Sequence, residues 1–161
     1  MKKIALGGKH GRGKFALVDD EDFEELNKHK WCIGGGYALR EIWINGKGKT
    51  ELMHRVINKT PDGLQTDHIN WNKLDNRKIN LRSCTASQNR MNRGCPKNNS
   101  TGVKGVRIQV RKHKGKTYKY IQAQIGVNGK QIHLGIFKTL EEASQSYADA
   151  VKKYFGEFGR I

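Results

Sequence analysis

The chain has 161 residues, with 31 Lys and Arg against 15 Asp and Glu and a formal net charge of +16 at pH 7. Such an excess of positive charge is typical of proteins that bind nucleic acids. A basic protein of a membrane surface is the alternative, but the sequence has no long apolar run and no Lys-rich amphipathic helix with an aromatic face. The length favours one domain. The sequence pattern nevertheless differs between segments of the chain, and each segment can enclose only a small hydrophobic core.

Nothing in the sequence directs the protein out of the cytosol. The Met-Lys-Lys start is similar to that of a secretory signal, but the apolar stretch Ile4 to Leu6 is short and runs into Gly-Gly-Lys-His. The three cysteines, Cys32, Cys84 and Cys95, are an odd number without C-x-x-C spacing. A structural zinc site would need borrowed histidines, so we expect reduced thiols in a cytoplasmic protein.

Residues 1–60 are predicted to form a β-rich support region. Lys14 to Val18 is a short strand, and Asp20 to Lys28 a short helix that places Phe23 and Leu26 on one face. The acidic run at the start of this helix suits the helix dipole, which is a better explanation than a metal site.

Two further strands are predicted at Tyr37 to Ile44 and Thr50 to Ile57. The sequence Asn45-Gly46-Lys47-Gly48 between them is a hairpin signal. His54 therefore lies in a predicted strand, where a histidine commonly binds a backbone group and has no other role.

The stretch from Leu64 to Arg93 has the pattern strand, loop, strand, helix. Leu64 to Ile69 and Leu81 to Thr85 are the strands, and the capping box Thr85-x-x-Gln88 starts the helix at Ala86. The connection NWNKLDNRKIN is rich in Asn, which suits turns that satisfy their own backbone groups.

Three side chains of this stretch suggest phosphodiester hydrolysis with one divalent cation. Mg²⁺ prefers oxygen ligands, and the Asp67 carboxylate and the Asn89 amide carbonyl supply two of them. His68, with an ordinary pKa of about 6.5, can accept a proton from the attacking water. Adjacent strand residues point to opposite faces, so Asp67 and His68 converge only if the strand ends or bulges there.

The run DHINWNKLDNRKINLRSCTASQNRMN resembles the HNH, or ββα-metal, nucleases of the phage homing-endonuclease type. The resemblance implies that Asp67 and Asn89 bind the metal, that His68 is the general base, and that Asn80 braces the long loop. It also implies a bacterial or phage-infected cell as the setting.

Two more positions bear on this resemblance. Trp71 stands where the family usually has Gly. A His-Arg pair commonly precedes the nuclease motif, so the resemblance implies that His54 and Arg55 line the active site or contact phosphate, as an alternative to a purely structural role for His54.

Residues 94–100 form a polar linker, and residues 101–161 a second unit. Val103 to Arg111, Tyr118 to Ile125 and Lys130 to Phe137 alternate as strands, and the capping box Thr139-x-x-Glu142 opens a final helix. The apolar strand positions are expected to pack on the helix side that carries Ala143, Tyr147, Ala150, Val151 and Tyr154.

The opposite face of this predicted sheet is basic and polar. From Lys104 to Lys130 there are eight Lys or Arg and no Asp or Glu. A sheet of this size fits the major groove, where Arg suits guanine and Gln suits adenine. Expected base-reading or stacking side chains are Arg107, Gln109, Arg111, Tyr118, Tyr120, Gln122 and Gln124, and expected phosphate contacts are Lys112, Lys114 and Lys116.

This unit resembles the Apetala-type DNA-binding domain of plant ethylene-response factors. The matching residues are Gly105-Val106-Arg107, Leu134 to Thr139 and Glu141-Glu142-Ala143 with Ser146-Tyr147. Plant members present Trp on the sheet face, where this chain has Tyr118 and Tyr120.

The sequence thus predicts an α+β protein in four parts: a support region (1–60), an HNH unit (61–93), a linker (94–100) and an Apetala-like domain of three antiparallel strands on one helix (101–161). The predicted function is site-specific cleavage of double-stranded DNA by a homing-type endonuclease that depends on Mg²⁺, or on Mn²⁺, and nicks one strand as a monomer. A non-catalytic DNA-binding regulator is the main alternative. An RNA-binding protein is a third alternative, suggested by the charge alone, because the sequence has no aromatic ribonucleoprotein signature.

Overall fold

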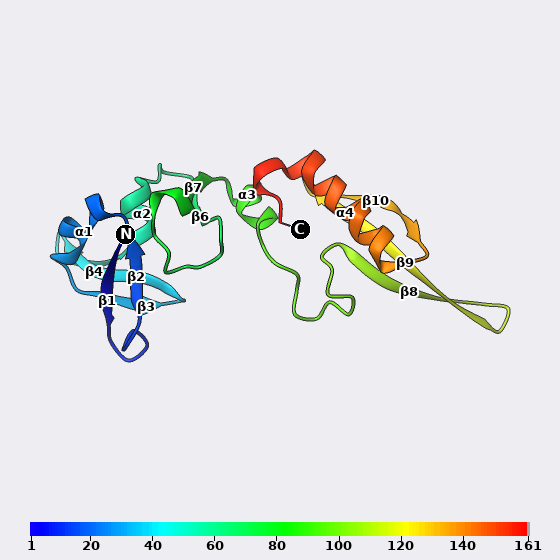
Figure 1. Cartoon of the computed structure of the whole chain (residues 1–161), viewed down its shortest axis with the longest axis horizontal. Coiled ribbons are helices and arrows are strands. Elements are labelled where there is room, and N and C mark those ends of the chain that lie inside the picture. Colours follow the sequence, from blue (N-terminus) through cyan, green and yellow to red (C-terminus); the bar gives the residue numbers. More distant parts are fainter. Residues whose placement is uncertain (161) are drawn as a thin grey trace. The chain divides into compact units, whose positions relative to one another are not determined.

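A computed structural model describes residues 1–160, and the chain divides into two compact units, Met1–Ala86 and Ser87–Ile161 (Figure 1). Each unit has its own hydrophobic core. Both combine sheets with few helices, so the protein is of the α+β class that the sequence predicts.

The first unit is built on a five-stranded sheet with the strand order β2-β1-β3-β4-β5. β1 runs parallel to β3, and the other neighbouring strands are antiparallel. The strands are β1 (Lys2–Gly7), β2 (Phe15–Val18), β3 (Trp31–Gly34), β4 (Tyr37–Ile44) and β5 (Lys47–Leu52). The helices are α1 (Asp20–Asn27) and α2 (Met53–Asn58), and a second, two-stranded sheet pairs β6 (Gln65–His68) with β7 (Leu81–Cys84).

The core of this unit joins the sheet to its helices. Ile4 and Leu6 alternate into the core along β1, and Trp31 is only 2% exposed. The Trp31 indole Nε1 donates to the Leu26 carbonyl at 2.8 Å, which fixes the end of α1 against β3. As predicted, α1 turns Phe23 and Leu26 toward this core.

The predicted strand Thr50 to Ile57 is wrong beyond Leu52. β5 ends there, and Met53 begins α2. Met53, His54 and Ile57 are all buried, and positions i, i+1 and i+4 can share one side of a helix, whereas a strand would turn the adjacent Met53 and His54 to opposite faces. A short apolar run with Val56 and Ile57 does not distinguish a strand from a buried helix, and packing against the core decides in favour of the helix.

The second unit contains a three-stranded antiparallel sheet in the order β10-β9-β8. Its elements are α3 (Ala86–Met91), β8 (Val106–His113), β9 (Lys116–Val127), β10 (Lys130–Phe137), α4 (Leu140–Phe155) and a short 3₁₀ helix (Gly156–Phe158). The predicted capping box of α4 is confirmed, because Thr139 accepts from the Glu142 N–H at 3.2 Å and the Glu142 carboxylate accepts from the Thr139 N–H at 3.3 Å.

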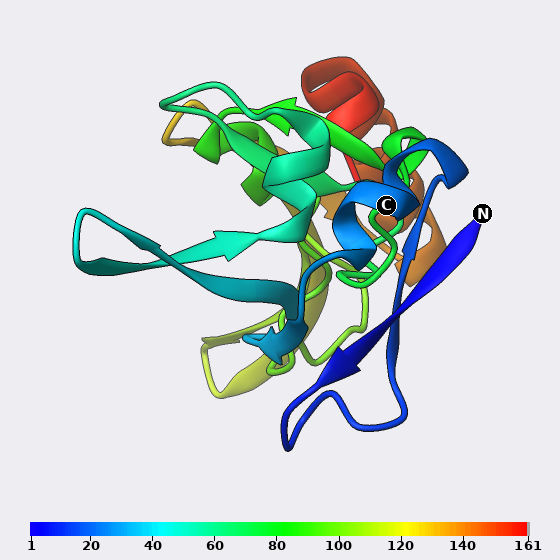
Figure 2. The ribbon, with the colours of Figure 1, turned by 90° about the vertical axis from the view of Figure 1, so that its left-hand side faces the viewer.

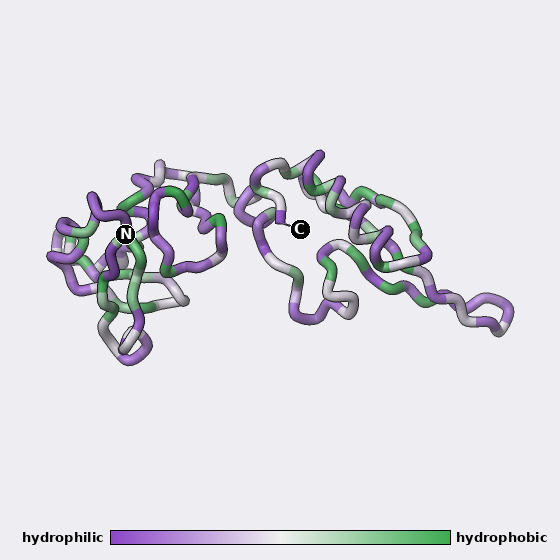
Figure 3. The backbone as a smooth tube through the Cα atoms, viewed as in Figure 1, coloured by the Kyte–Doolittle hydropathy of each residue, from purple (hydrophilic) through white to green (hydrophobic). Residues whose placement is uncertain are grey.

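The apolar sheet face is covered by α4 over only part of its length. Val106 is 1% exposed, whereas Ile108 and Val110 on the same strand are 50% and 54% exposed. The β8–β9 hairpin extends beyond the helix, and its tip is hydrophilic (Figure 3). Tyr154 was also expected on the packed side of α4 but is 37% exposed; Phe155, four residues after Val151, is buried instead.

Candidate active site

The β6–β7 hairpin places Asp67 and His68 at the end of a strand. β6 ends at His68, and both side chains are 5% exposed. Asp67 stands opposite Arg82 in the strand register, and the Arg82 Nε and Nη2 groups donate to Asp67 Oδ2 at 3.0 and 2.8 Å. Arg82 thus gives the Asp67 carboxylate a charged partner at a nearly closed site.

His68 is held through its Nε2 atom by Asn76. His68 Nε2 lies 3.2 Å from Asn76 Oδ1, and the Asn76 Nδ2 group donates to the Leu74 carbonyl at 3.3 Å. Because Asn76 uses its amide N–H group there, its Oδ1 accepts from His68 Nε2–H. The proton-accepting lone pair of the neutral imidazole is then on Nδ1.

Aromatic rings surround the His68 imidazole. The centroid of the His54 ring is 5.0 Å away in an edge-on arrangement, and that of Tyr37 is 5.9 Å away. Burial lowers the pKa of His68, while the hydrogen bond with Asn76 and the charge of Asp67 act in the opposite direction. The lowered pKa favours the neutral form of His68, which is the form that a general base requires.

His54 is buried on α2 rather than in a strand. Its exposed fraction is 5%, and its Nδ1 atom has no hydrogen-bond partner among residues 1–160. Burial, followed by the charges of His68 and Arg55, lowers the pKa of His54 to about 4. His54 lines the wall next to His68, whereas Arg55 donates through Nη1 to the Leu64 carbonyl at 3.1 Å.

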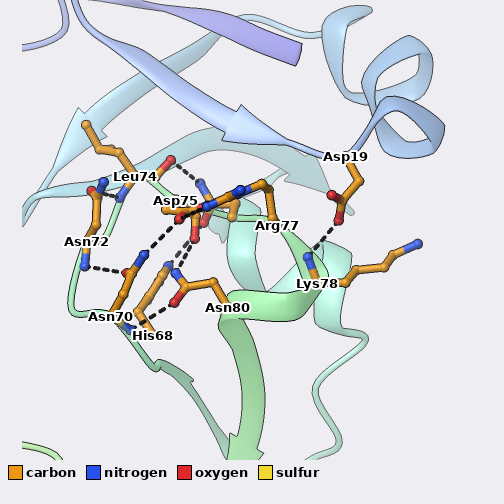
Figure 4. A network of polar contacts seen from close by, with 10 residues as sticks. Asp19, His68, Asn70, Asn72, Leu74, Asp75, Arg77, Lys78 and Asn80 are labelled. Carbon is orange, nitrogen blue, oxygen red and sulfur yellow. Dashed lines mark hydrogen bonds and ion pairs between the residues drawn. The ribbon is translucent and has the colours of Figure 1, made fainter. Parts of the chain in front are cut away.

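Asn80 ties together the two ends of the long loop (Figure 4). Its Oδ1 accepts from the Asn70 N–H at 2.9 Å, and its Nδ2 donates to the Asp75 carbonyl at 2.7 Å. Asp75 in turn accepts from Asn70 Nδ2 at 2.8 Å and is paired with Arg77 at 2.6 Å. The loop that follows His68 is thus held by side chains of its own.

The loop also shows how the chain accommodates Trp71. This residue has φ +63°, and its N–H donates to the His68 carbonyl at 3.0 Å. A left-handed backbone is easy for Gly and costly for Trp. Trp71 thus holds a backbone conformation that Gly would adopt at little cost.

Asn89 lies on α3 in the second unit. Within residues 1–160, no three His, Cys, Asp or Glu side chains form a group that could hold a metal. The Asp67 carboxylate is a hard oxygen donor, which suits Mg²⁺ better than Zn²⁺. A carboxylate has about four acceptor positions. Asp67 can therefore bind a cation while it also accepts hydrogen bonds from Arg82.

The predicted DNA-reading side chains lie on one face of the β8–β9–β10 sheet. Arg107 stands opposite Gln122, Gln109 opposite Tyr120, and Arg111 opposite Tyr118 in the register. Arg107 Nη2 donates to Gln122 Oε1 at 3.3 Å, and Gln122 Nε2 lies 3.0 Å from His133 Nδ1, so a polar ladder crosses all three strands. Lys112, Lys114 and Lys116 are exposed at the hairpin tip, and Gln124 faces His133 in the register.

Sequence reasoning did not identify Tyr37, Asn76 or Arg82 as site residues. The position of Arg82 follows from the hairpin register, which pairs it with Asp67. Asn76 contacts His68 from an irregular loop, and Tyr37 contacts it from another sheet. No local sequence pattern predicts such contacts.

None of the helices in the described part of the chain is long and apolar enough to cross a membrane. An HNH endonuclease family model matches residues 52–91, a range that includes α2 as well as the β6–β7 hairpin. An uncharacterized HNH endonuclease of Acanthamoeba polyphaga mimivirus is 35% identical over 155 residues, which cover 92% of this chain and 74% of that protein. No solved structure matches. The chain belongs to the HNH endonuclease family and is a nuclease.

Proposed function

We propose that the protein cleaves double-stranded DNA at specific sites with the help of one divalent metal ion, Mg²⁺ or Mn²⁺. The observation that carries the proposal is the placement of His68: it is buried at the end of β6, bound through Nε2 to Asn76, and next to Asp67 in the chain. A neutral imidazole next to a carboxylate supplies a base and an anionic ligand at one point.

The chemistry is hydrolysis of a phosphodiester bond. His68 Nδ1 accepts a proton from a water molecule as the water oxygen attacks the phosphorus, and the bond from phosphorus to the leaving sugar oxygen breaks. Asp67 and Asn89 are the proposed ligands of the cation, which when bound offsets the negative charge that grows on the phosphate and the leaving oxygen. Asn80 acts at a distance by holding the loop that follows His68.

The test is a plasmid-cleavage assay with and without Mg²⁺. His68→Ala is expected to lose about a hundred- to ten-thousand-fold in rate while retaining DNA binding. Asp67→Ala and Asn89→Ala are expected to shift the metal concentration needed for activity. His29, which is exposed, provides a matched control as His29→Ala. Cleavage by His68→Ala at the wild-type rate would show that another group is the base.

We further propose that the sheet of the second unit selects the DNA sequence. The Arg107–Gln122–His133 ladder supports this, because it presents a fixed row of donors and acceptors on an exposed face. Alanine at Arg107 or Arg111 is expected to cost about 1 to 3 kcal/mol and to relax one position of the target, whereas alanine at Lys114 is expected to weaken all sequences alike. A selection from random DNA distinguishes the two effects.

The proposed product is a nick made by a monomer. The chain has one Asp-His…Asn…Asn set, and one base with one metal organises one attack at a time. Supercoiled plasmid at limiting enzyme is expected to accumulate open circles, and sedimentation of the complex is expected to give one chain per DNA. Direct conversion to linear DNA by a dimer would exclude this product. A homing role is the biological setting that we propose for such a cut.

A further inference from the structure

The β4–β5 hairpin of the first unit carries a tryptophan that the fold does not explain. Trp43, near the end of β4, is 77% exposed, and the neighbouring Ile44 is 48% exposed. Trp31, in contrast, is 2% exposed and anchors the core. An indole left in water contributes almost none of the apolar burial for which Trp is suited. The stability of the unit therefore gives no reason for Trp at this position.

The hairpin is a preformed arm. It extends away from the rest of the first unit (Figure 2). Its turn residues Asn45 and Gly46 have φ +52° and +75°, the signs of a tight hairpin turn whose twist matches that of its strands. Gly48 stands opposite Trp43 in the register and has no side chain that would cover the ring.

The tip of this arm is positively charged. Lys47 and Lys49 flank Gly48, and among the residues that the structure describes neither forms a hydrogen bond or ion pair through its side chain. The two acids nearest the tip are already engaged: Glu41 accepts from Thr50 at 2.7 Å, and Glu51 is paired with Arg40 at 2.6 Å. Thr50 is neutral, so Glu41 keeps its charge. The hairpin carries three positive residues, Arg40, Lys47 and Lys49, against Glu41 and Glu51, and its net charge is +1.

We propose that the β4–β5 hairpin is a DNA-contacting arm of the catalytic unit, in which the Trp43 ring packs on sugars and bases and Lys47 and Lys49 contact phosphates. This proposal rests on the proposed function, because it takes DNA as the substrate. An apolar wedge flanked by cations is a combination that nucleic acid accommodates. A second copy of the chain is a poor occupant, since a symmetric contact at this tip would bring like charges together.

The experiment measures binding of the full-length protein to a labelled duplex without metal, together with plasmid cleavage. Trp43→Ala is expected to weaken binding about ten-fold with an unchanged melting temperature, and Trp43→Phe to recover most of the affinity. The double variant Lys47→Ala, Lys49→Ala is expected to lower the slope of log affinity against log salt by about two. Ile79, which is 82% exposed outside the hairpin, supplies the control Ile79→Ala, with wild-type binding expected.

The possible outcomes distinguish a failure of the arm proposal from a failure of the proposed function. If the wild type cuts DNA and Trp43→Ala binds equally well, the arm is refuted and the function stands. If the wild type neither binds nor cuts any duplex, both are refuted. If the wild type sediments as a dimer and Trp43→Ala sediments as a monomer, the hairpin serves self-association instead.

Discussion

Asn80 offers a quantitative test of how the loop after His68 is held. Asn80→Ala removes the two hydrogen bonds that join this side chain to the Asn70 N–H and the Asp75 carbonyl. Asn80 is 5% exposed, so water does not easily replace the lost amide. A buried backbone group left without its partner costs about 1 to 3 kcal/mol. For the two groups together we expect a loss of about 2 to 4 kcal/mol, the lower value applying if the loop relaxes.

Chemical denaturation, followed by a probe in the first unit, measures this loss. Asn72→Ala is the matched control, because Asn72 lies in the same loop but its Oδ1 accepts from the Leu74 N–H at an exposed position, at 3.1 Å. The control is expected to lose less than about 1 kcal/mol. Equal losses in the two variants, or a loss below about 0.5 kcal/mol for Asn80→Ala, would refute the bracing role. Cleavage by Asn80→Ala is expected to fall further than stability alone explains.

Three more perturbations test individual contacts. Trp71→Gly is expected to be about 1 kcal/mol more stable than Trp71→Ala, because Ala retains the strain of the left-handed backbone; equal denaturation midpoints would contradict this. His54, with a pKa of about 4 in the folded protein, is protonated first in the unfolded chain, so the free energy of unfolding should fall by up to about 3 kcal/mol between pH 6.5 and 4, a slope that His54→Gln should reduce in pH-dependent denaturation. Lys104 Nζ donates to the Met91 and Arg93 carbonyls at 2.7 and 2.8 Å, so Lys104→Met should speed amide exchange in α3 about ten-fold, and unchanged exchange would show that these contacts do not hold the helix.

The β6–β7 hairpin was predictable because its information is local. Leu81 to Cys84 begins and ends with buried side chains, and Gln65 to His68 leads directly into a loop rich in Asn. The loop interpretation is also confirmed in detail, since Asn70 and Asn72 accept from backbone N–H groups two residues further on. Side chains that act on their own turn can be recognised in a sequence.

β1 and β3 were not predicted, and their pairing explains why. β3 is the four-residue run Trp31–Gly34, and the burial of its side chains does not alternate. It becomes a strand by pairing with β4 on one side and, in parallel, with Leu6 and Gly7 of β1 on the other. A parallel pair joins residues far apart in sequence, and no local signal specifies it.

The error at α2 matters for the chemistry, because this helix shapes the surroundings of His68. In a strand, Met53 and His54 would point to opposite faces. In α2 both are buried, and they contact the hydrogen-bonded pair of His68 and Asn76: Met53 Sδ accepts from Asn76 Nδ2 at 3.5 Å, while the His54 ring lies against the His68 ring. The burial that favours the neutral form of His68 thus comes in part from residues that precede the nuclease motif. Residues 1–60 therefore do more than support the site, since they help to bury its proposed base.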